Sequence, residues 1–478
     1  MGGNPAPEPI VLRGHGGDVQ CVAFTTLGGV ECLLSGDSNG DVVAWDLALR
    51  RPLWRLAAHP PSSGVLSVEA MPGGASWAPG DTSERGETSA TRVLTQGRDG
   101  TLKCWRASGA DAPSPDPAWS VTSGSFHFCR FASARDVSTT NLRALAVVGA
   151  ETSAVDVLAV LADAPDAPPA HARTFRVPTE CSYEKKRSET PEGKLGTVMA
   201  CAFLFAPFAS GEATDETSPR SNSGALLLVV GYEEGTVALW DCERVGDGTA
   251  APPPLSEAED ECDAKTFRER FEARVSGAPL WRERAHGDAV TSIAADTRRG
   301  GFVSASADGG VLRFSVRAVR ETIREDESSG EPNETKTKTR VSTRVRRAQA
   351  HGGAPEDAFA TGAATRGVAC VAVRDDGAVF AAGGWDGRTR VYEMRGDRGS
   401  SGSGGELKPK RKPKRLASLG FHDDVVSCAA FRTAGGGKGA RTFAGWLATG
   451  SRDGAVALWP IFPPKIRADG DGDEDEDA

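Results

Sequence analysis

The chain has little of what marks metal sites, secretion or membrane insertion. Of its 478 residues only seven are histidine, and its ten cysteines include no Cys-x-x-Cys pair. No apolar run approaches the 18 residues that indicate a membrane-spanning helix, and the first residues lack the basic and apolar regions of a signal peptide. We therefore expect a reducing compartment, no metal, no cofactor and no membrane partner.

The overall charge and the turn-forming residues further narrow the class of protein. The net charge is −9, so no direct nucleic-acid partner is expected. The 57 glycines and 29 prolines indicate many turns. The sequence is thus typical of a turn-rich, acidic interaction protein.

One unit, WLATGSRDGAVALW at 446–459, recurs along the chain. It contains an apolar strand, an Asp-Gly turn and a second alternating strand, which together predict a β-hairpin with a type I′ turn. In seven copies the turn residue precedes a large apolar residue by the same five positions. The turn residues are Gly40, Gly100, Ser153 (in a decayed copy), Gly235, Gly309, Gly387 and Gly454.

A histidine, three strands and a closing tryptophan are the WD-repeat pattern, which predicts an all-β, seven-bladed propeller of four-stranded sheets. The chain breaks at prolines after Trp459, so the last blade lacks an outer strand, and Ile10–Leu12 is a spare strand that we expect to complete it. The predicted repeats span approximately 10–46, 53–106, 119–160, 174–242, 280–316, 347–394 and 416–460, within a propeller of 1–464, followed by a disordered acidic tail at 465–478.

The turns lie 53 to 82 residues apart, whereas a WD repeat without insertions is about 40–45 residues long. Long insertions are therefore expected. We predict that most are mobile loops, among them 243–278, 317–346 and 395–415. The segment 256–275 carries a capping box and apolar residues at helical spacing, which predicts a helix. That helix packs on its own propeller or docks a partner.

Most of the histidines open repeats. In WD repeats such a histidine bonds the Asp of the tight turn, so five repeated pairs indicate a structural device rather than general-base chemistry. Only His127 and His171 remain, too few for a metal cluster. The predicted pairs are His15 with Asn39, His59 with Asp99, His286 with Asp308, His351 with Asp386, and His422 with Asp453.

Three further features suggest contacts. Arg98, Trp385 and Arg452 precede the turn Asp positions and are candidates for a partner-binding rim, since exposed Trp and Arg are enriched in binding hot spots. The acidic tail either is merely solvated or contacts a basic partner. A basic run predicts either a nuclear-localisation signal or a solvated loop; it comprises Lys408, Lys410, Arg411, Lys412, Lys414 and Arg415.

The motifs LTQGRDGTLKCW (94–105), GGWDGRTRVY (383–392) and WLATGSRDGAVALWPIFPP (446–464) resemble those of the ASTRA-associated WD-repeat family, also called guanine-nucleotide-binding-protein beta-subunit-like. The resemblance implies a non-enzymatic nuclear scaffold, with the cytoplasm as second location. It implies links to chromatin regulation and to the co-chaperone that matures phosphatidylinositol-3-kinase-related kinases. No G-protein gamma subunit is expected, because only nine residues precede the first strand.

Two rival functions remain open. A cullin-ligase substrate receptor usually carries Arg two residues after Trp-Asp, but Trp45-Asp46 and Trp240-Asp241 are not followed by it. A propeller enzyme needs a convergent polar set near the channel, and only the repeated His–Asp pairs are visible. Co-purification of the ligase adaptor would favour the first rival. Activity lost on changing His127 or His171 alone would favour the second.

Overall fold

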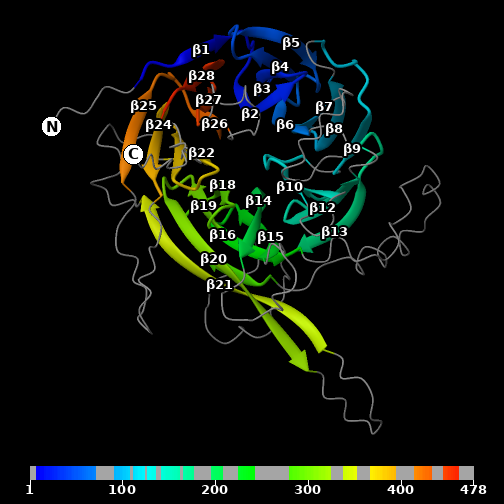
Figure 1. The fold of residues 1–478 in the computed structure, drawn as a ribbon, viewed down its shortest axis with the longest axis vertical. Coiled ribbons are helices and arrows are strands. Elements are labelled where there is room, and N and C mark those ends of the chain that lie inside the picture. The colour runs from blue at the N-terminus through cyan, green and yellow to red at the C-terminus, as the bar shows by residue number, and fades with distance from the viewer. Residues whose placement is uncertain are drawn as a thin grey trace, which may run out of the picture.

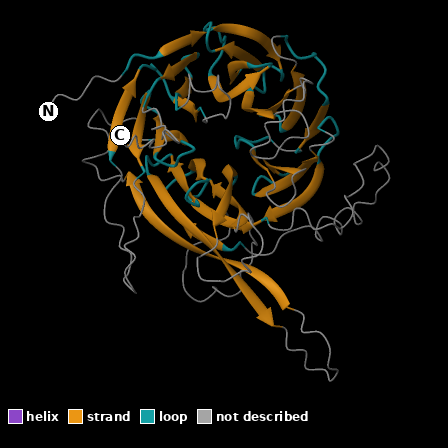
Figure 2. Ribbon diagram, in the orientation of Figure 1, coloured by secondary structure: helices purple, strands orange, loops and turns teal. Residues whose placement is uncertain are grey.

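The computed structural model is a closed ring of seven four-stranded antiparallel sheets (Figure 1). It describes residues 7–71, 91–107, 111–123, 126–135, 142–161, 165–176, 195–207, 224–242, 279–324, 337–351, 367–394, 414–432 and 445–461. Within these ranges every regular element is a strand (Figure 2), and no helix could span a membrane. The predicted all-β seven-bladed propeller is confirmed.

The first three blades each use four consecutive strands, numbered from the channel outward. Their strands are β2 (Val19–Leu27), β3 (Val30–Asp37), β4 (Asp41–Asp46) and β5 (Arg51–Ala57) in blade 1; β6 (Val65–Met71), β7 (Thr91–Gly97), β8 (Thr101–Ala107) and β9 (Trp119–Thr122) in blade 2; and β10 (Ala132–Arg135), β11 (Leu142–Val148), β12 (Ala154–Leu161) and β13 (Ala170–Arg176) in blade 3.

Blades 4 to 6 repeat this order. Their strands are β14 (Val198–Pro207), β15 (Gly224–Tyr232), β16 (Thr236–Asp241) and β17 (Trp281–Arg284) in blade 4; β18 (Val290–Asp296), β19 (Gly301–Ser306), β20 (Val311–Arg324) and β21 (Thr337–His351) in blade 5; and β22 (Val368–Val373), β23 (Val379–Gly384), β24 (Arg388–Glu393) and β25 (Arg415–Gly420) in blade 6.

Blade 7 joins the two ends of the chain. Its inner strands are β26 (Val426–Phe431), β27 (Leu447–Ser451) and β28 (Ala455–Trp459), and its outer strand is β1 (Ile10–Arg13). β1 pairs antiparallel with β28, from Ile10 opposite Leu458 to Arg13 opposite Ala455. The predicted closure of the ring by the N-terminal strand is therefore confirmed.

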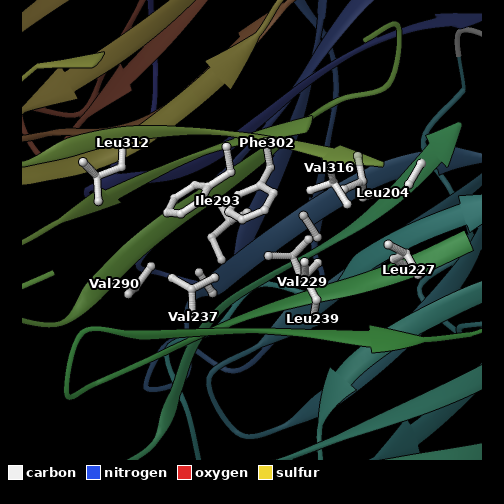
Figure 3. Packing of buried hydrophobic residues seen from close by; sticks show 14 of the residues in the cluster. Leu204, Leu227, Val229, Val237, Leu239, Val290, Ile293, Phe302, Leu312 and Val316 are labelled. Atoms are coloured by element: carbon white, nitrogen blue, oxygen red, sulfur yellow. The ribbon is translucent and has the colours of Figure 1, made fainter. Parts of the chain in front are cut away.

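The core lies between neighbouring blades, because alternate residues of each strand point toward opposite faces of its sheet. Between blades 4 and 5, Leu239 and Val229 of one sheet meet Phe302 and Leu312 of the next (Figure 3). Phe302 and Phe314 stack with ring centroids 4.5 Å apart. Each blade thus buries apolar residues on both of its faces.

The hairpin turns differ from the predicted type I′ geometry, which requires positive φ at both central residues. At the last turn only Gly454 has positive φ (76°), and its N–H donates to the Ser451 carbonyl at 3.2 Å. This is a type I turn followed by a left-handed glycine, the three-residue hairpin with a bulge. The aspartate keeps negative φ, so that its carboxylate accepts from the Ala455 N–H at 2.8 Å.

The predicted loop at 317–346 is wrong for most of its length. β20 continues to Arg324 and β21 starts at Thr337, so the two strands form a long hairpin that projects beyond the ring (Figure 1). Period-two β-branched residues explain the difference, since they favour extended strands over a loop. The predicted helix at 256–275 and the acidic tail at 465–478 lie outside the described residues, as do the insertions at 243–278 and 395–413.

Candidate functional site

A buried hydrogen-bond chain links β27, β28 and the turn between them to the loop that precedes blade 7. His422 Nδ1 lies 2.9 Å from Asp453 Oδ2, and its Nε2 lies 2.9 Å from Thr449 Oγ1. Trp459 Nε1 donates to the same threonine oxygen at 3.0 Å. Since the carboxylate accepts at Nδ1–H, the Nε2 of a neutral imidazole accepts the Thr449 hydroxyl proton. Every polar atom along this chain is satisfied.

Blade 1 repeats the chain with one change from the predicted pairing. His15 Nδ1 bonds Asp37 Oδ2 at 2.9 Å rather than Asn39, so that prediction is wrong. Asp37 lies at the end of β3, and its other oxygen accepts from the Asn39 N–H at 3.0 Å. Ser35 completes the chain, 2.6 Å from His15 Nε2 and 2.7 Å from Trp45 Nε1.

In blades 2 and 5 the histidine bonds the hydroxyl group but lies farther from the predicted aspartate. His59 Nε2 is 2.9 Å from Thr95 Oγ1, and its Nδ1 is 4.0 Å from Asp99 Oδ1. His286 Nε2 is 2.7 Å from Ser304 Oγ, and its Nδ1 is 4.0 Å from Asp308 Oδ1. The histidine therefore fastens the loop before each blade to the second strand of that blade.

Blade 6 departs from the pattern. Asp386 accepts from Arg390 on the neighbouring strand, at 3.0 and 2.6 Å, and Ala382 stands where blades 1, 2, 5 and 7 have the hydroxyl residue. The side chain of His351, the predicted partner, lies outside the described set.

Burial lowers the pKa of His422 and of His59, which favours the neutral form of both imidazoles. Burial, aided by Lys103, lowers the pKa of His59 to about 4, although Asp99 opposes the shift. The unfolded state binds the proton from about pH 6.5 downward. The contribution of neutral His59 to stability is therefore full above pH 6.5 and is lost as the pH falls toward 4.

We expect His59→Gln to reduce the pH dependence of stability between pH 4 and 6.5, because the variant has no imidazole to protonate. The slope of the unfolding free energy against pH should fall by up to about 1.4 kcal/mol per pH unit. Urea unfolding at several pH values measures this slope. An unchanged slope would mean that His59 titrates alike in both states.

The two remaining histidines do not form a site together. His127 lies before the inner strand of blade 3, and its Nδ1 bonds the Cys129 carbonyl at 3.1 Å. Burial lowers the pKa of His127. His171 lies on the outer strand of the same blade, 3.1 Å from Thr174 Oγ1 and 3.4 Å from Asp156 Oδ1. Within the described ranges no cluster of potential metal ligands occurs.

The central channel holds a cavity of about 620 Å³, and the inner strands of six blades line it together with the segment before β10. Arg98, Trp385 and Arg452, each from the turn of a different blade, all line this cavity. The structure thus brings the three predicted rim residues to one channel mouth, which is defined here by these residues together with Phe128 and Arg130.

Trp385 is held in place yet still available for contact. The Trp385 ring lies against Gly367, where a β-carbon would collide with it, and the Trp385 backbone N–H donates to the Gly367 carbonyl at 3.0 Å. The residue remains 39% exposed. It therefore packs on its own blade and also presents apolar surface at the mouth.

The sequence-based reasoning missed the segment 126–131. Phe126 and Phe128 are 79% and 65% exposed, and Arg98 lies over the Phe128 ring at 5.4 Å. Arg130 Nη2 donates across the channel to the Gln20 and Ser427 carbonyls, at 2.7 and 2.8 Å. The sequence FHFCRF, with three phenylalanines among six residues outside the repeated hairpins, was the available signal.

Only two residues of the basic run are described. Lys414 and Arg415 lie at the start of β25 and are exposed. The other four lie outside the described ranges, so the localisation signal remains a prediction.

Comparison with known proteins agrees with this geometry. The family of the WD domain, G-beta repeat, matches residues 8–46 and 359–393. The fold is a seven-bladed propeller, and in these residues the chain is similar to WD-repeat proteins.

The predicted resemblance to ASTRA-associated WD-repeat proteins is confirmed over nearly the whole chain. ASTRA-associated protein 1 of Aspergillus niger is 24% identical over 96% of this chain and 98% of its own length. The Verticillium alfalfae protein of the same name is 24% identical over 95% of this chain and 93% of its own length. Guanine nucleotide-binding protein subunit beta-like protein 1 of mouse is 24% identical over 96% of this chain and 98% of its own length.

Proposed function

We propose that this propeller is a non-catalytic scaffold subunit of an ASTRA-type assembly in the nucleus. Its role there would be in chromatin regulation and in the maturation and stability of phosphatidylinositol-3-kinase-related kinases. The observation that carries the proposal is the full-length similarity to proteins named for their association with ASTRA. The described histidines that open repeats, His15, His59, His286 and His422, act as buried structural donors and acceptors, which favours a scaffold over an enzyme.

The channel mouth is the proposed contact site. It combines an exposed Trp with Arg98 and Arg452, and these residue types dominate binding energy at protein interfaces. A Trp already held against its own blade loses little side-chain entropy on binding. The partner segment would therefore present an apolar group flanked by carboxylates.

Affinity purification of the tagged full-length chain with mass spectrometry tests the assembly. Recovery of ASTRA or kinase-maturation subunits is the expected result. Recovery of a cullin-ligase adaptor in their place would contradict it and favour a substrate receptor.

Trp385→Ala should weaken capture of those subunits about 30-fold, the effect of losing a hot spot worth about 2 kcal/mol. Thermal unfolding should change little, because the ring is partly exposed and packs mainly on Gly367. Leu49→Ala, which truncates a 58% exposed side chain away from the mouth, is the matched control. Equal capture by both variants would exclude the mouth as the contact site.

A further inference from the structure

Two cysteine thiols meet beside the central channel. Cys129 lies in the segment before β10, and Cys201 lies on β14, the inner strand of blade 4. Cys129 Sγ donates to Cys201 Sγ at 3.8 Å, although 72 positions of the sequence separate the two residues. The packing of blade 3 beside blade 4 therefore creates this pair.

One carbonyl group holds both thiols. The Arg130 carbonyl oxygen lies 3.4 Å from Cys129 Sγ and 3.4 Å from Cys201 Sγ. This oxygen has two lone pairs, so it can accept from both S–H groups and hold the two sulfurs beside each other. The sulfurs of a disulfide are about 2.05 Å apart, so the two atoms would have to approach by roughly 1.8 Å. Cys129 precedes Ala132, the first paired residue of β10, so this approach breaks no strand pairing.

The two thiols differ in their access to small molecules. Eight cysteines are described, all as free thiols, and seven of them are buried. Cys201 is the exception, since it is partly exposed and lines the channel cavity. The hydrogen bond with Cys201 and burial raise the pKa of Cys129, so Cys129 keeps its proton. An oxidant that enters the channel therefore meets Cys201 first.

We propose that Cys129 and Cys201 are a modification site, at which a peroxide that enters the channel forms a reversible disulfide. In a reducing compartment such a bond is transient and serves to sense oxidation. The proposal rests on the contact between the two sulfurs and on the access to Cys201. It does not depend on the proposed function.

The reaction has two steps. Cys201 gives its proton to water and its thiolate attacks one oxygen of hydrogen peroxide; the O–O bond breaks, and the hydroxide that leaves takes up a proton. Cys201 is then a sulfenic acid. Cys129 gives up its proton as its sulfur attacks Cys201 Sγ; the S–O bond breaks, and the hydroxide that leaves becomes a second water. In total the two thiols lose two electrons and two protons, and one peroxide is reduced to two waters.

The disulfide joins the channel mouth to blade 4. Phe128 and Arg130 flank Cys129, and both belong to the mouth. Arg130 Nη2 already fastens this segment to the Gln20 and Ser427 carbonyls of blades 1 and 7. A covalent bond to β14 fixes the same segment from another side. Any change in partner capture on oxidation rests on the proposed function, whereas the disulfide is measured without a partner.

Trypsin separates the two thiols for the test. It yields the peptides 107–130 and 195–220, each of which contains one cysteine. Full-length protein is treated with a small excess of hydrogen peroxide, the remaining thiols are blocked with iodoacetamide, and the digest is analysed by mass spectrometry. A linked pair of these peptides that dithiothreitol separates is the expected result. The linked pair should be at least fivefold less abundant after oxidation in urea, where the contact is lost and all ten cysteines compete.

Single substitutions test the order of the two steps. In Cys129→Ala the sulfenic acid on Cys201 has no thiol to attack it, so dimedone should label peptide 195–220. In Cys201→Ala peptide 107–130 should take up at least tenfold less dimedone, because Cys129 is 1% exposed. Cys370→Ala is the matched control. It removes a buried inner-strand thiol that bonds the Val426 carbonyl at 3.4 Å, and it should form the 129–201 link as the wild type does.

Four results would overturn the proposal. They are the absence of the linked peptides from native protein, an equal yield in urea, a link that joins two chains on a non-reducing gel, and dimedone on peptide 107–130 in place of 195–220. The wild-type digest needs no substitution, so the test stands even where an alanine variant fails to fold.

Discussion

Leu12→Asp is expected to open the ring and lower the free energy of unfolding by more than about 4 kcal/mol. Leu12 is 1% exposed and packs with Trp45 and Val43 in the core between blades 7 and 1. A carboxylate there would be buried among the apolar residues of this core. The strand would leave β28, whose free edge then favours association with other molecules.

Urea unfolding and size-exclusion chromatography measure the two effects. Leu12→Ala should cost about 3 kcal/mol, as expected for a truncated core leucine, without association. Arg13→Ala, at the next and exposed position of the same strand, should change stability by less than about 0.5 kcal/mol. If Leu12→Asp stays monomeric and unfolds with the free energy of the wild type, β1 does not hold the ring closed.

Thr449→Val should lower the free energy of unfolding by about 3 kcal/mol although it barely changes side-chain volume. The threonine hydroxyl bonds both His422 and Trp459, so its loss leaves two buried nitrogens without a partner. Each unsatisfied group costs about 1–3 kcal/mol.

The control is a threonine-to-valine substitution at a position where no hydrogen bond is lost. Thr389 is 1% exposed, and its hydroxyl has no partner among the described residues. Thr389→Val should therefore be neutral or slightly stabilising, because valine buries no polar atom. If both variants lost the same free energy of unfolding, the hydrogen-bond chain would make no specific contribution to stability. Both values come from urea unfolding at pH 7.5.

The propeller could be predicted because its signal is repeated and local. The five-residue interval from the turn residue to the large apolar residue recurs in every repeat, so one sequence alone is enough to reveal it. The closure of blade 7 by the N-terminal strand follows from counting the strands. The histidine chain was only half predicted. The hydroxyl residues Ser35, Thr95, Ser304 and Thr449 each stand four residues before the predicted turn Asn or Asp, a spacing that the sequence contained.

The remaining differences have physical causes. His15 bonds Asp37 rather than Asn39 because the turn places the end of β3 nearest the imidazole, which strand patterning does not reveal. The β20–β21 extension carried its own signal, since Thr337, Thr339, Val341, Thr343 and Val345 are β-branched at every second position. High charge on the alternate positions suggested a solvated loop. Arg130 reaches carbonyls of two other blades, a contact that only the closed ring creates.

The closure of blade 7 also has a consequence for synthesis. Ile10 lies 448 positions before its partner Leu458 (458 − 10), so the ribosome makes β1 long before β28. At 5–20 residues per second the interval is on the order of a minute. During that time blades 1 to 6 can form from consecutive strands, while β1 has no strand with which to pair. β1 can join its sheet only after β28 has been made, so the synthesis of β28 is the step that allows the ring to close.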